Sequence, residues 1–286
     1  MIEKQELVAK SVEWNLPINT VEKDYVLSLI LYGIANHPDL KENWIFKGGT
    51  CIKKCYLANY RFSEDLDFTL IAKANLNPHK IHSQLNEVAE IVHSAFGLIV
   101  NVTDIKVNSF PDKNGLFLQA KLPFRGPISV SGSYPNIKFD LSGEEKLVDT
   151  PESRKLLHSY SDANESTCDI LCYNFSELLA EKLRALTERA RPRDLYDVVK
   201  LYACHEHFGA TLEQITGITK DKFDHRGLSY PIHLLNIPEH RIAELKVDWD
   251  IMLKHQLSHL ESADIYLERF DEIKKTFCNL IHISSV

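Results

Sequence analysis

Residues 46–70 of the chain, FKGGTCIKKCYLANYRFSEDLDFTL, join a pair of glycines to a pair of carboxylates. Gly48 and Gly49 follow a short apolar segment that predicts a strand ending in a turn. Asp65 and Asp67 stand two residues apart in a second apolar segment, EDLDFTLI, whose alternation also predicts a strand. A solvated strand edge would explain one aspartate, but it explains less well why both aspartates and the glycines occur so close together.

The strand pattern places both aspartates on one face, because successive side chains of a strand point to opposite sides of the sheet. A later segment, NIKFDLS (residues 136–142), repeats the pattern and sets Asp140 opposite its apolar residues. If the two strands are neighbours, the three carboxylates converge and repel one another unless a cation compensates. Hard oxygen ligands suit Mg²⁺, and a pair of such ions is a recurring device for displacement at phosphorus. We therefore expect one or two Mg²⁺ ions at Asp65, Asp67 and Asp140.

The two glycines would allow the backbone to approach a ligand closely. The segment that follows, TCIKKCYLA, predicts a helix that begins at Thr50. The first amides of this helix would point at whatever lies beside the turn, and phosphate is the natural occupant. Because any tight turn uses glycine, the pair alone is weak support for a nucleotide site.

Composition excludes several classes of function. The chain has 286 residues, of which 44% are hydrophobic and 26% charged, as in ordinary globular proteins. Its net charge of −7 argues against wholesale coating of a nucleic acid, although it leaves room for a local basic groove. The first segment, MIEKQELVAKSVEWN, does not predict a secretory signal, and no apolar run is long enough to span a bilayer. We expect a cytoplasmic protein without a membrane partner.

The six cysteines include two C-x3-C pairs, Cys51/Cys55 and Cys168/Cys172. A structural zinc site prefers C-x2-C or C-x4-C pairs with histidines at finger-like spacing, which the histidines of this chain do not supply. The sequence therefore predicts free thiols, mostly packed as small apolar residues, and no structural metal.

The order of the predicted elements indicates an α+β fold. A helical pattern covers residues 3–36, strands are expected over residues 43–49, 64–71, 98–107, 115–124 and 136–142, and a helix is expected over residues 79–96. From Phe175 onward the pattern is helical almost to the end. We predict an α/β-type head over residues 1–155 and an α-helical C-terminal half over residues 156–286, with the boundary in the polar, turn-rich stretch 149–167.

The helical half carries further candidates. Lys182 lies off the leucine stripe of FSELLAEKLRALTERA (residues 175–190), where it could reach a triphosphate or only water. In RPRDLYDVVKLYA (residues 191–203) Asp194 is placed to cap a helix, and Asp197 would complete a capping box. A cationic strip suited to phosphates or to an RNA end, or else a set of surface arginines, comes from Arg189, Arg191 and Arg193.

Together these stretches resemble the nucleotidyltransferase superfamily, in particular its AbiEii/AbiGii (MenT-like) toxin branch. FKGGT and RFSEDLDF match its glycine and D-x-D motifs, and further matches are VEKDYVL (21–27), AEKLRAL (180–186) and RPRDLYD (191–197). The resemblance implies a nucleotidyltransferase-like mixed sheet with flanking helices. It also implies that Lys182 is essential and that Asp194 acts in the active site, where it would orient Lys182 or the nucleotide. Within R-x-S-x-D-x-D, Ser63 would bind a phosphate, and Arg61 would neutralise phosphate or RNA charge.

The implied reaction is transfer of a nucleoside monophosphate from an NTP to an acceptor hydroxyl, with release of pyrophosphate. The triphosphate would be held by Gly48, Gly49, Thr50, Ser63 and Lys182. The resemblance further implies a toxin that modifies an RNA, with the tRNA 3′ acceptor end as the expected acceptor, and a cognate antitoxin protein. Two alternatives stay open: nucleotidylation of a protein or a small molecule, and a catalytically inactive nucleotide-binding module. The second is disfavoured because all three aspartates are present.

Overall fold

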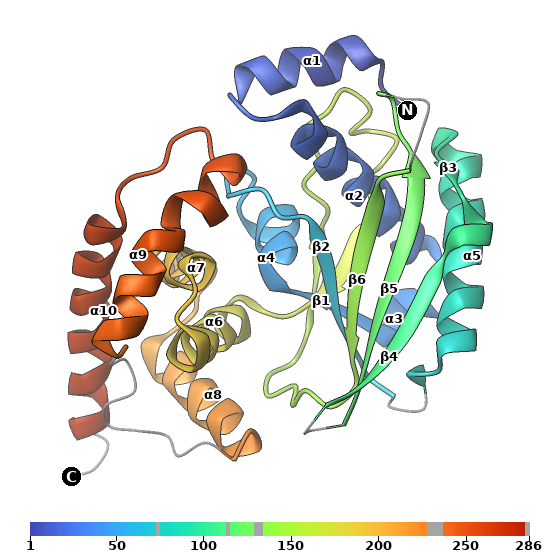
Figure 1. Cartoon of the computed structure of the whole chain (residues 1–286). Coiled ribbons are helices and arrows are strands. Elements are labelled where there is room, and N and C mark those ends of the chain that lie inside the picture. The colour runs from blue at the N-terminus through green and yellow to red at the C-terminus, as the bar shows by residue number, and fades with distance from the viewer. Residues whose placement is uncertain (73–74, 113–114, 129–133, 228–236, 284–286) are drawn as a thin grey trace. The chain divides into compact units, whose positions relative to one another are not determined.

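The computed structural model of the chain describes residues 1–72, 75–112, 115–128, 134–227 and 237–283 (Figure 1). These residues form two compact units, one made of residues 1–145 and 151–173 and the other of residues 146–150 and 174–286. The first unit is a mixed sheet with helices, and the second is helical. The predicted α+β class with a helical C-terminal part is confirmed.

The first unit is built on a mixed sheet that has eight strands in the described part of the chain. Its strands are β1 (Trp44–Lys47), β2 (Asp65–Leu70), β3 (Ile99–Val100), β4 (Lys106–Asp112), β5 (Gly115–Arg125), β6 (Asn136–Ser142), β7 (Glu152–Lys155) and β8 (Asp169–Cys172). The order across the sheet is β3-β5-β6-β2-β1-β8-β7, and β4 also pairs with β5. The pairs β2/β6 and β1/β8 are parallel, and the other pairs are antiparallel.

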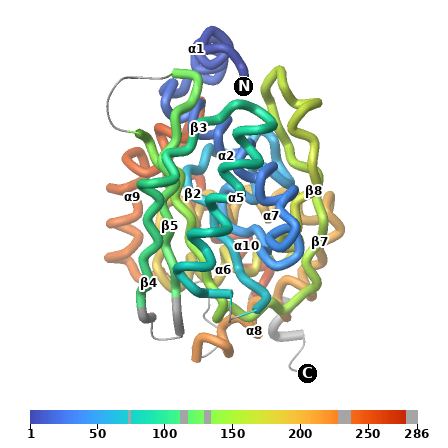
Figure 2. Tube along the Cα trace, turned by 90° about the vertical axis from the view of Figure 1, so that its right-hand side faces the viewer, coloured from blue at the N-terminus to red at the C-terminus, as the bar shows by residue number. Residues whose placement is uncertain are grey.

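Two long helices cover one face of this sheet (Figures 1 and 2). The helices of the unit are α1 (Lys4–Glu13), α2 (Ile18–Asn36), α3 (Leu40–Asn43), α4 (Gly48–Cys51) and α5 (Pro78–Phe96), and α4 continues as a π-helical turn over Ile52–Tyr56. Helices α2 and α5 approach closely at Gly33, where a Cβ atom would lie 2.7 Å from Val92 Cγ1. The apolar side of the sheet is buried, including Leu66, Phe68 and Phe139. Alternation therefore sends Asp65, Asp67 and Asp140 to the opposite side.

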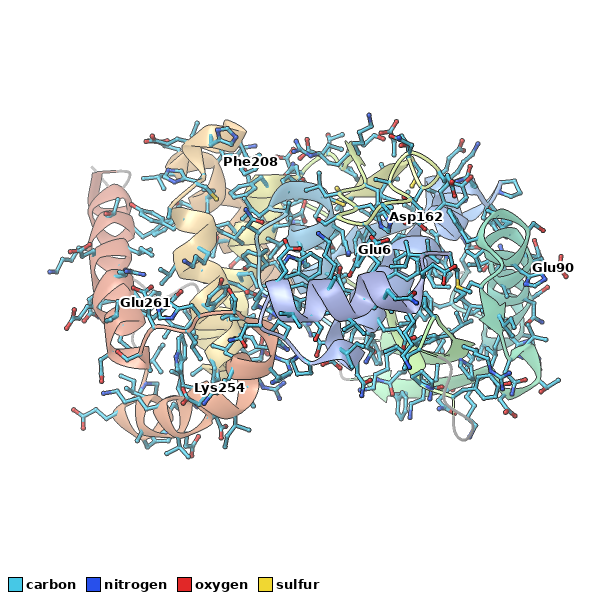
Figure 3. The ribbon with its side chains drawn as sticks, turned by 90° about the horizontal axis from the view of Figure 1, so that it is seen from above. Glu6, Glu90, Asp162, Phe208, Lys254 and Glu261 are labelled. Atoms are coloured by element: carbon cyan, nitrogen blue, oxygen red, sulfur yellow. The ribbon has the colours of Figure 1, made fainter. Side chains whose placement is uncertain are left out.

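The segment between β7 and β8 is tied to the first two helices by acidic side chains. Glu6 of α1 accepts a hydrogen bond from the Ser161 amide at 2.8 Å. Asp162 accepts one from the Tyr25 hydroxyl of α2 at 2.7 Å (Figure 3). These bonds hold the segment between β7 and β8 against the helices. Its polar, turn-rich sequence had instead predicted a boundary between the two halves of the chain.

The second unit consists of five longer helices among the described residues, α6 (Phe175–Arg189), α7 (Pro192–Tyr202), α8 (Leu212–His225), α9 (Glu239–Leu253) and α10 (Ala263–Ile283). Asn174 caps α6 by accepting a hydrogen bond from the Glu177 amide at 2.9 Å. Trp249 of α9 is buried and donates its indole N–H to the Glu261 carbonyl at 2.9 Å. The Glu261 side chain, marked in Figure 3, forms a bidentate pair with Arg269 of α10. No helix in the described part of the chain is long and apolar enough to cross a bilayer.

Several predicted elements differ from the structure for local reasons. The helical pattern over residues 3–36 is two helices, because Pro17 interrupts it and then precedes the first residue of α2. The strand expected over residues 98–107 is divided between β3 and β4 by a 3-10 turn at Val102–Asp104. The helix after the glycines begins at Gly48 and not at Thr50. The expected boundary near residue 155 differs from the division into units, because β7 and β8 complete the first unit's sheet.

Candidate active site

The glycine turn at the end of β1 lies against the second half of the D-x-D motif. Gly48 has a φ of +79°, a left-handed conformation that side chains other than glycine rarely adopt. A Cβ atom on Gly48 would overlap the Asp67 carboxylate. A Cβ atom on Gly49 would lie 2.7 Å from Arg61 Nη2 and 3.2 Å from Ser63 Oγ. The structure therefore brings the two glycines, Arg61, Ser63 and Asp67 together. This close packing is possible because neither residue of the turn has a side chain.

The three carboxylates lie on adjacent parallel strands. Asp67 of β2 is the Cα partner of Asp140 of β6, and Asp65 stands two residues before Asp67 on the same face. Burial raises the pKa of Asp65 above its ordinary value, and the charge of Asp140 adds to this effect, while Lys138 opposes it. A cation bound at Asp65 would offset both the cost of burying its charge and the repulsion from Asp140. By its chemistry the donor set, three hard oxygen ligands on one face, suits a divalent cation such as Mg²⁺. In the described part of the chain the oxygens of these three carboxylates do not form a group within 4.8 Å of one another.

Asp140 is held by a residue that the sequence pattern did not single out. Gln119 of β5 is its Cα partner across the antiparallel pair and donates its amide N–H to Asp140 Oδ1 at 3.0 Å. This bond orients one oxygen of Asp140 and leaves the other for a ligand. A polar residue on one side of an alternating strand is common, so Gln119 becomes recognisable only when the register is known.

Thr50 and Lys47 connect the glycine turn to its surroundings. The Thr50 hydroxyl does not cap α4 and instead donates to the Asp65 carbonyl at 2.5 Å, which ties the turn to β2. Lys47 is the Cα partner of Asp67 and forms an ion pair with Glu145. The same carboxylate of Glu145 lies 3.4 Å from the Tyr173 hydroxyl. The side chain of Thr50 therefore positions β2, and Lys47 belongs to an acid–base cluster beside the carboxylates.

The second unit contains its own buried charge cluster. Lys182 of α6 lies 2.7 Å from Asp197 Oδ2 and 3.7 Å from Asp194 Oδ1. Both aspartates are fully buried, whereas Arg189, which binds Asp194 through Nε at 2.6 Å and Nη2 at 2.8 Å, is about half exposed. The sequence predicts Asp194 as a helix cap, but α7 begins at Pro192, no side chain caps it, and Asp194 is the third residue, within the first turn. Asp194 and Asp197 instead hold the two cations.

The cationic strip is therefore partly neutralised within the second unit. Arg189 is paired with Asp194, which strengthens the guanidinium's hold on its proton and raises its pKa. Arg191 is exposed at the start of α7, and Arg193 is half-buried. Arg189 and Arg191 are both exposed, but the guanidinium of Arg189 is already bound by Asp194.

A mixed sheet that carries a D-x-D pair beside a glycine turn, with a third carboxylate on the neighbouring strand, defines a nucleotidyltransferase. A family model described as nucleotidyl transferase AbiEii toxin, type IV TA system, matches residues 29–276. The chain belongs to this family, and it is a nucleotidyltransferase toxin of a type IV toxin–antitoxin system. The predicted resemblance is confirmed.

The solved structure of MenT4, a nucleotidyltransferase toxin from Mycobacterium tuberculosis H37Rv, has the same fold. The two superpose with a TM-score of 0.63 over 97% of this chain and 89% of MenT4, at 17% sequence identity. Comparison with curated proteins gives no match. At this identity the structural likeness supports the fold, and the roles of individual residues rest on the geometry described above.

Proposed function

We propose that the protein transfers a nucleoside monophosphate from an NTP to a hydroxyl at the 3′ acceptor end of a tRNA. One observation supports this reaction most strongly, namely the alignment of Asp67 with Asp140 on parallel strands, with Asp65 on the same face. Such a cluster binds Mg²⁺ and phosphate oxygens together, which an isolated surface aspartate does not. We assign Asp65 and Asp67 as the residues that would hold one or two Mg²⁺ ions, and Asp140 as the residue that would complete this metal site or accept the proton of the acceptor hydroxyl.

The residues around the turn have complementary roles in this proposal. Gly48 and Gly49 leave room for the triphosphate, while Arg61 and Ser63 offer a charge and a hydroxyl beside it. Mg²⁺ bound there would neutralise the charge that develops on the leaving pyrophosphate. The acceptor oxygen bonds to the α-phosphorus as the bond to pyrophosphate breaks, and the hydroxyl proton passes to Asp140, which Gln119 holds in place.

Lys182 and Asp194 enter the proposal through the family motif. Lys182 would bind the triphosphate, with Asp194 and Asp197 holding its ammonium group in one orientation. Arg191 would contact phosphate or RNA, whereas Arg189 would act mainly by fixing Asp194. A cognate antitoxin is the expected protein partner, as the type IV system implies.

A row of lysines supports a nucleic-acid acceptor despite the acidic net charge. Lys138 of β6 is the Cα partner of Asp65, and Lys121 of β5 and Lys106 of β4 follow it in register on the next two strands. Figure 1 shows these three strands side by side. Lys138 and Lys106 are exposed, and Lys121 is partly exposed. Three cations on successive strands, beginning beside the carboxylates, suit the phosphates of a nucleic-acid strand better than a small molecule. This row gives the local basic surface that the net charge conceals.

The test is to incubate the protein with Mg²⁺, total cellular RNA and each α-labelled NTP in turn. We expect label on RNA of tRNA size, lost in the Asp65→Ala/Asp67→Ala variant and lost after periodate oxidation of the RNA 3′ end. The Lys121→Glu variant should raise the KM for RNA with little change in kcat, since it affects binding and not the chemistry. Label on protein or on a small molecule would refute the RNA acceptor, and NTP binding without any transfer would refute catalysis.

A further inference from the structure

Three cysteines meet in the interior of the first unit. Cys51 is the last residue of α4, Cys55 lies in the π-helical turn that follows, and Cys172 is the last residue of β8. Their Sγ atoms lie within 4.8 Å of one another, and all three side chains are buried. The C-x3-C spacing of the sequence misleads here, because Cys168, the sequence neighbour of Cys172, is not part of this cluster.

The surroundings of the cluster suit bound charge better than apolar packing alone. Arg154 donates its Nε–H to the Cys55 carbonyl at 3.2 Å and stacks its guanidinium 4.5 Å from the Tyr56 ring centroid. The Tyr56 hydroxyl lies 3.8 Å from Cys172 Sγ. Arg154 and the Tyr56 hydroxyl therefore place a cation and a polar group beside the three sulfur atoms.

We propose that Cys51, Cys55 and Cys172 form a binding site for one soft d¹⁰ cation of the Zn²⁺ or Cu⁺ class. Three sulfur atoms that share an ion at about 2.3 Å lie about 4 Å from one another, which agrees with the observed cluster. Thiolates select such soft ions over Mg²⁺, so this site and the carboxylates would not compete for one metal. With Zn²⁺, three thiolates carry a net charge of −1. Arg154, which also lies 3.7 Å from Glu152 Oε2, is a cation beside them.

The site would brace the glycine turn. Cys51 stands two residues after Gly49, and Cys172 is the residue before Tyr173, whose amide donates to the Phe46 carbonyl of β1 at 2.9 Å. An ion shared by α4, the π-helical turn and β8 therefore joins both sides of the turn that contacts Asp67. The metal site itself does not depend on the proposed transfer reaction.

The experiment uses the full-length protein, reduced and stripped of metal, with Zn²⁺ and Cu⁺ as separate probes and Co²⁺ as a spectroscopic one. We expect uptake of one equivalent of Zn²⁺ or Cu⁺, a rise in Tm, and a sulfur-to-metal charge-transfer band with Co²⁺. The Cys51→Ala/Cys172→Ala variant should lose all three signals. Cys168→Ala, which removes one thiol outside the cluster, should keep them.

The wild-type titration decides the matter even if the double variant does not fold. Absence of uptake by the reduced wild-type protein would overturn the proposal, as would Co²⁺ spectra without a sulfur band. The proposal would also be overturned if two of the three cysteines form a disulfide and the protein binds no metal once this disulfide has been reduced. The Asp65→Ala/Asp67→Ala protein should bind Zn²⁺ or Cu⁺ as the wild type does, so failure of the thiolate site and failure of the proposed transfer reaction can be told apart.

Discussion

Replacement of Gly48 by alanine tests whether the glycine turn positions Asp67. Gly48 and Gly97 have similar backbone conformations, with φ of +79° and +72°. A Cβ atom on Gly48 would overlap the Asp67 carboxylate, whereas a Cβ atom on Gly97 meets nothing within 4 Å. The two alanine variants therefore share the backbone strain and differ in the displacement of Asp67, the carboxylate that we propose as a metal ligand.

The structure sets the expected magnitudes. A left-handed alanine costs about 1–2 kcal/mol, which lowers the Tm by about 2–8 °C at about 2–4 °C per kcal/mol for a unit of this size. Gly97→Ala should show this loss and retain wild-type transfer activity. In Gly48→Ala the Asp67 carboxylate must move, and a shift of about 1 Å at a reacting centre reduces the rate about 10²-fold. We therefore expect kcat to fall at least about 10²-fold in Gly48→Ala only.

Label transfer from an α-labelled NTP, measured beside thermal unfolding, gives both quantities from the same preparations. The comparison is informative because each variant carries one added methyl group at a left-handed glycine. If Gly48→Ala transfers label within a few-fold of the Gly97→Ala rate, Asp67 does not depend on the turn. The assigned role of Gly48 would then be wrong.

Three further predictions concern the charged groups. Gln119→Leu removes the hydrogen bond to Asp140 and should lower kcat at least about 10-fold, because a bond to a carboxylate contributes about 1.5–3 kcal/mol; unchanged transfer kinetics would contradict this role. Because the pKa of Asp65 is raised, the folded chain holds that proton more tightly than the unfolded chain, and ionisation costs stability as the pH rises above about 4. Without metal, Asp65→Asn should therefore have a higher Tm than the wild type at neutral pH and an equal one in acid, and a Tm difference independent of pH would count against it. Arg189→Ala leaves Asp194 buried with one partner fewer and should cost about 1–3 kcal/mol in urea unfolding, less than a fully buried pair because Arg189 is half exposed; the added change Asp194→Asn should recover part of it.

Local patterns were sufficient to predict the strands that carry the site. Alternation in residues 64–71 and 136–142 predicted which face Asp65, Asp67 and Asp140 share, and β2 and β6 have this arrangement. That reasoning assumed, and did not predict, that the two strands are neighbours in the sheet. Alternation specifies a face, but register depends on contacts between residues far apart in the chain, so it needed the structure.

The residues that sequence reasoning missed depend on such distant contacts. Gln119 has a role only because β5 places it opposite Asp140. Strand β8 is four residues long and follows a polar segment, so its local pattern is too short to predict a strand. The sequence therefore predicted only a free thiol at Cys172, while the fold sets it beside Cys51 and Cys55. The local sequence around Asp194 is typical of a helix cap. In the structure, however, Asp194 is buried and binds Arg189.

The parallel pairing of β1 with β8 has a consequence for the order in which the molecule matures. The strand that ends in the glycine turn is made early, but its partner at Cys172 is added only after more than half of the 286 residues have been synthesised. Pairings between segments so distant form late and slowly, because a long loop must close before they give any stability. We therefore expect that the glycine turn of a nascent chain is not held in place until β8 has left the ribosome. A chain built in this way would complete the sheet around its glycine turn only late in its own synthesis.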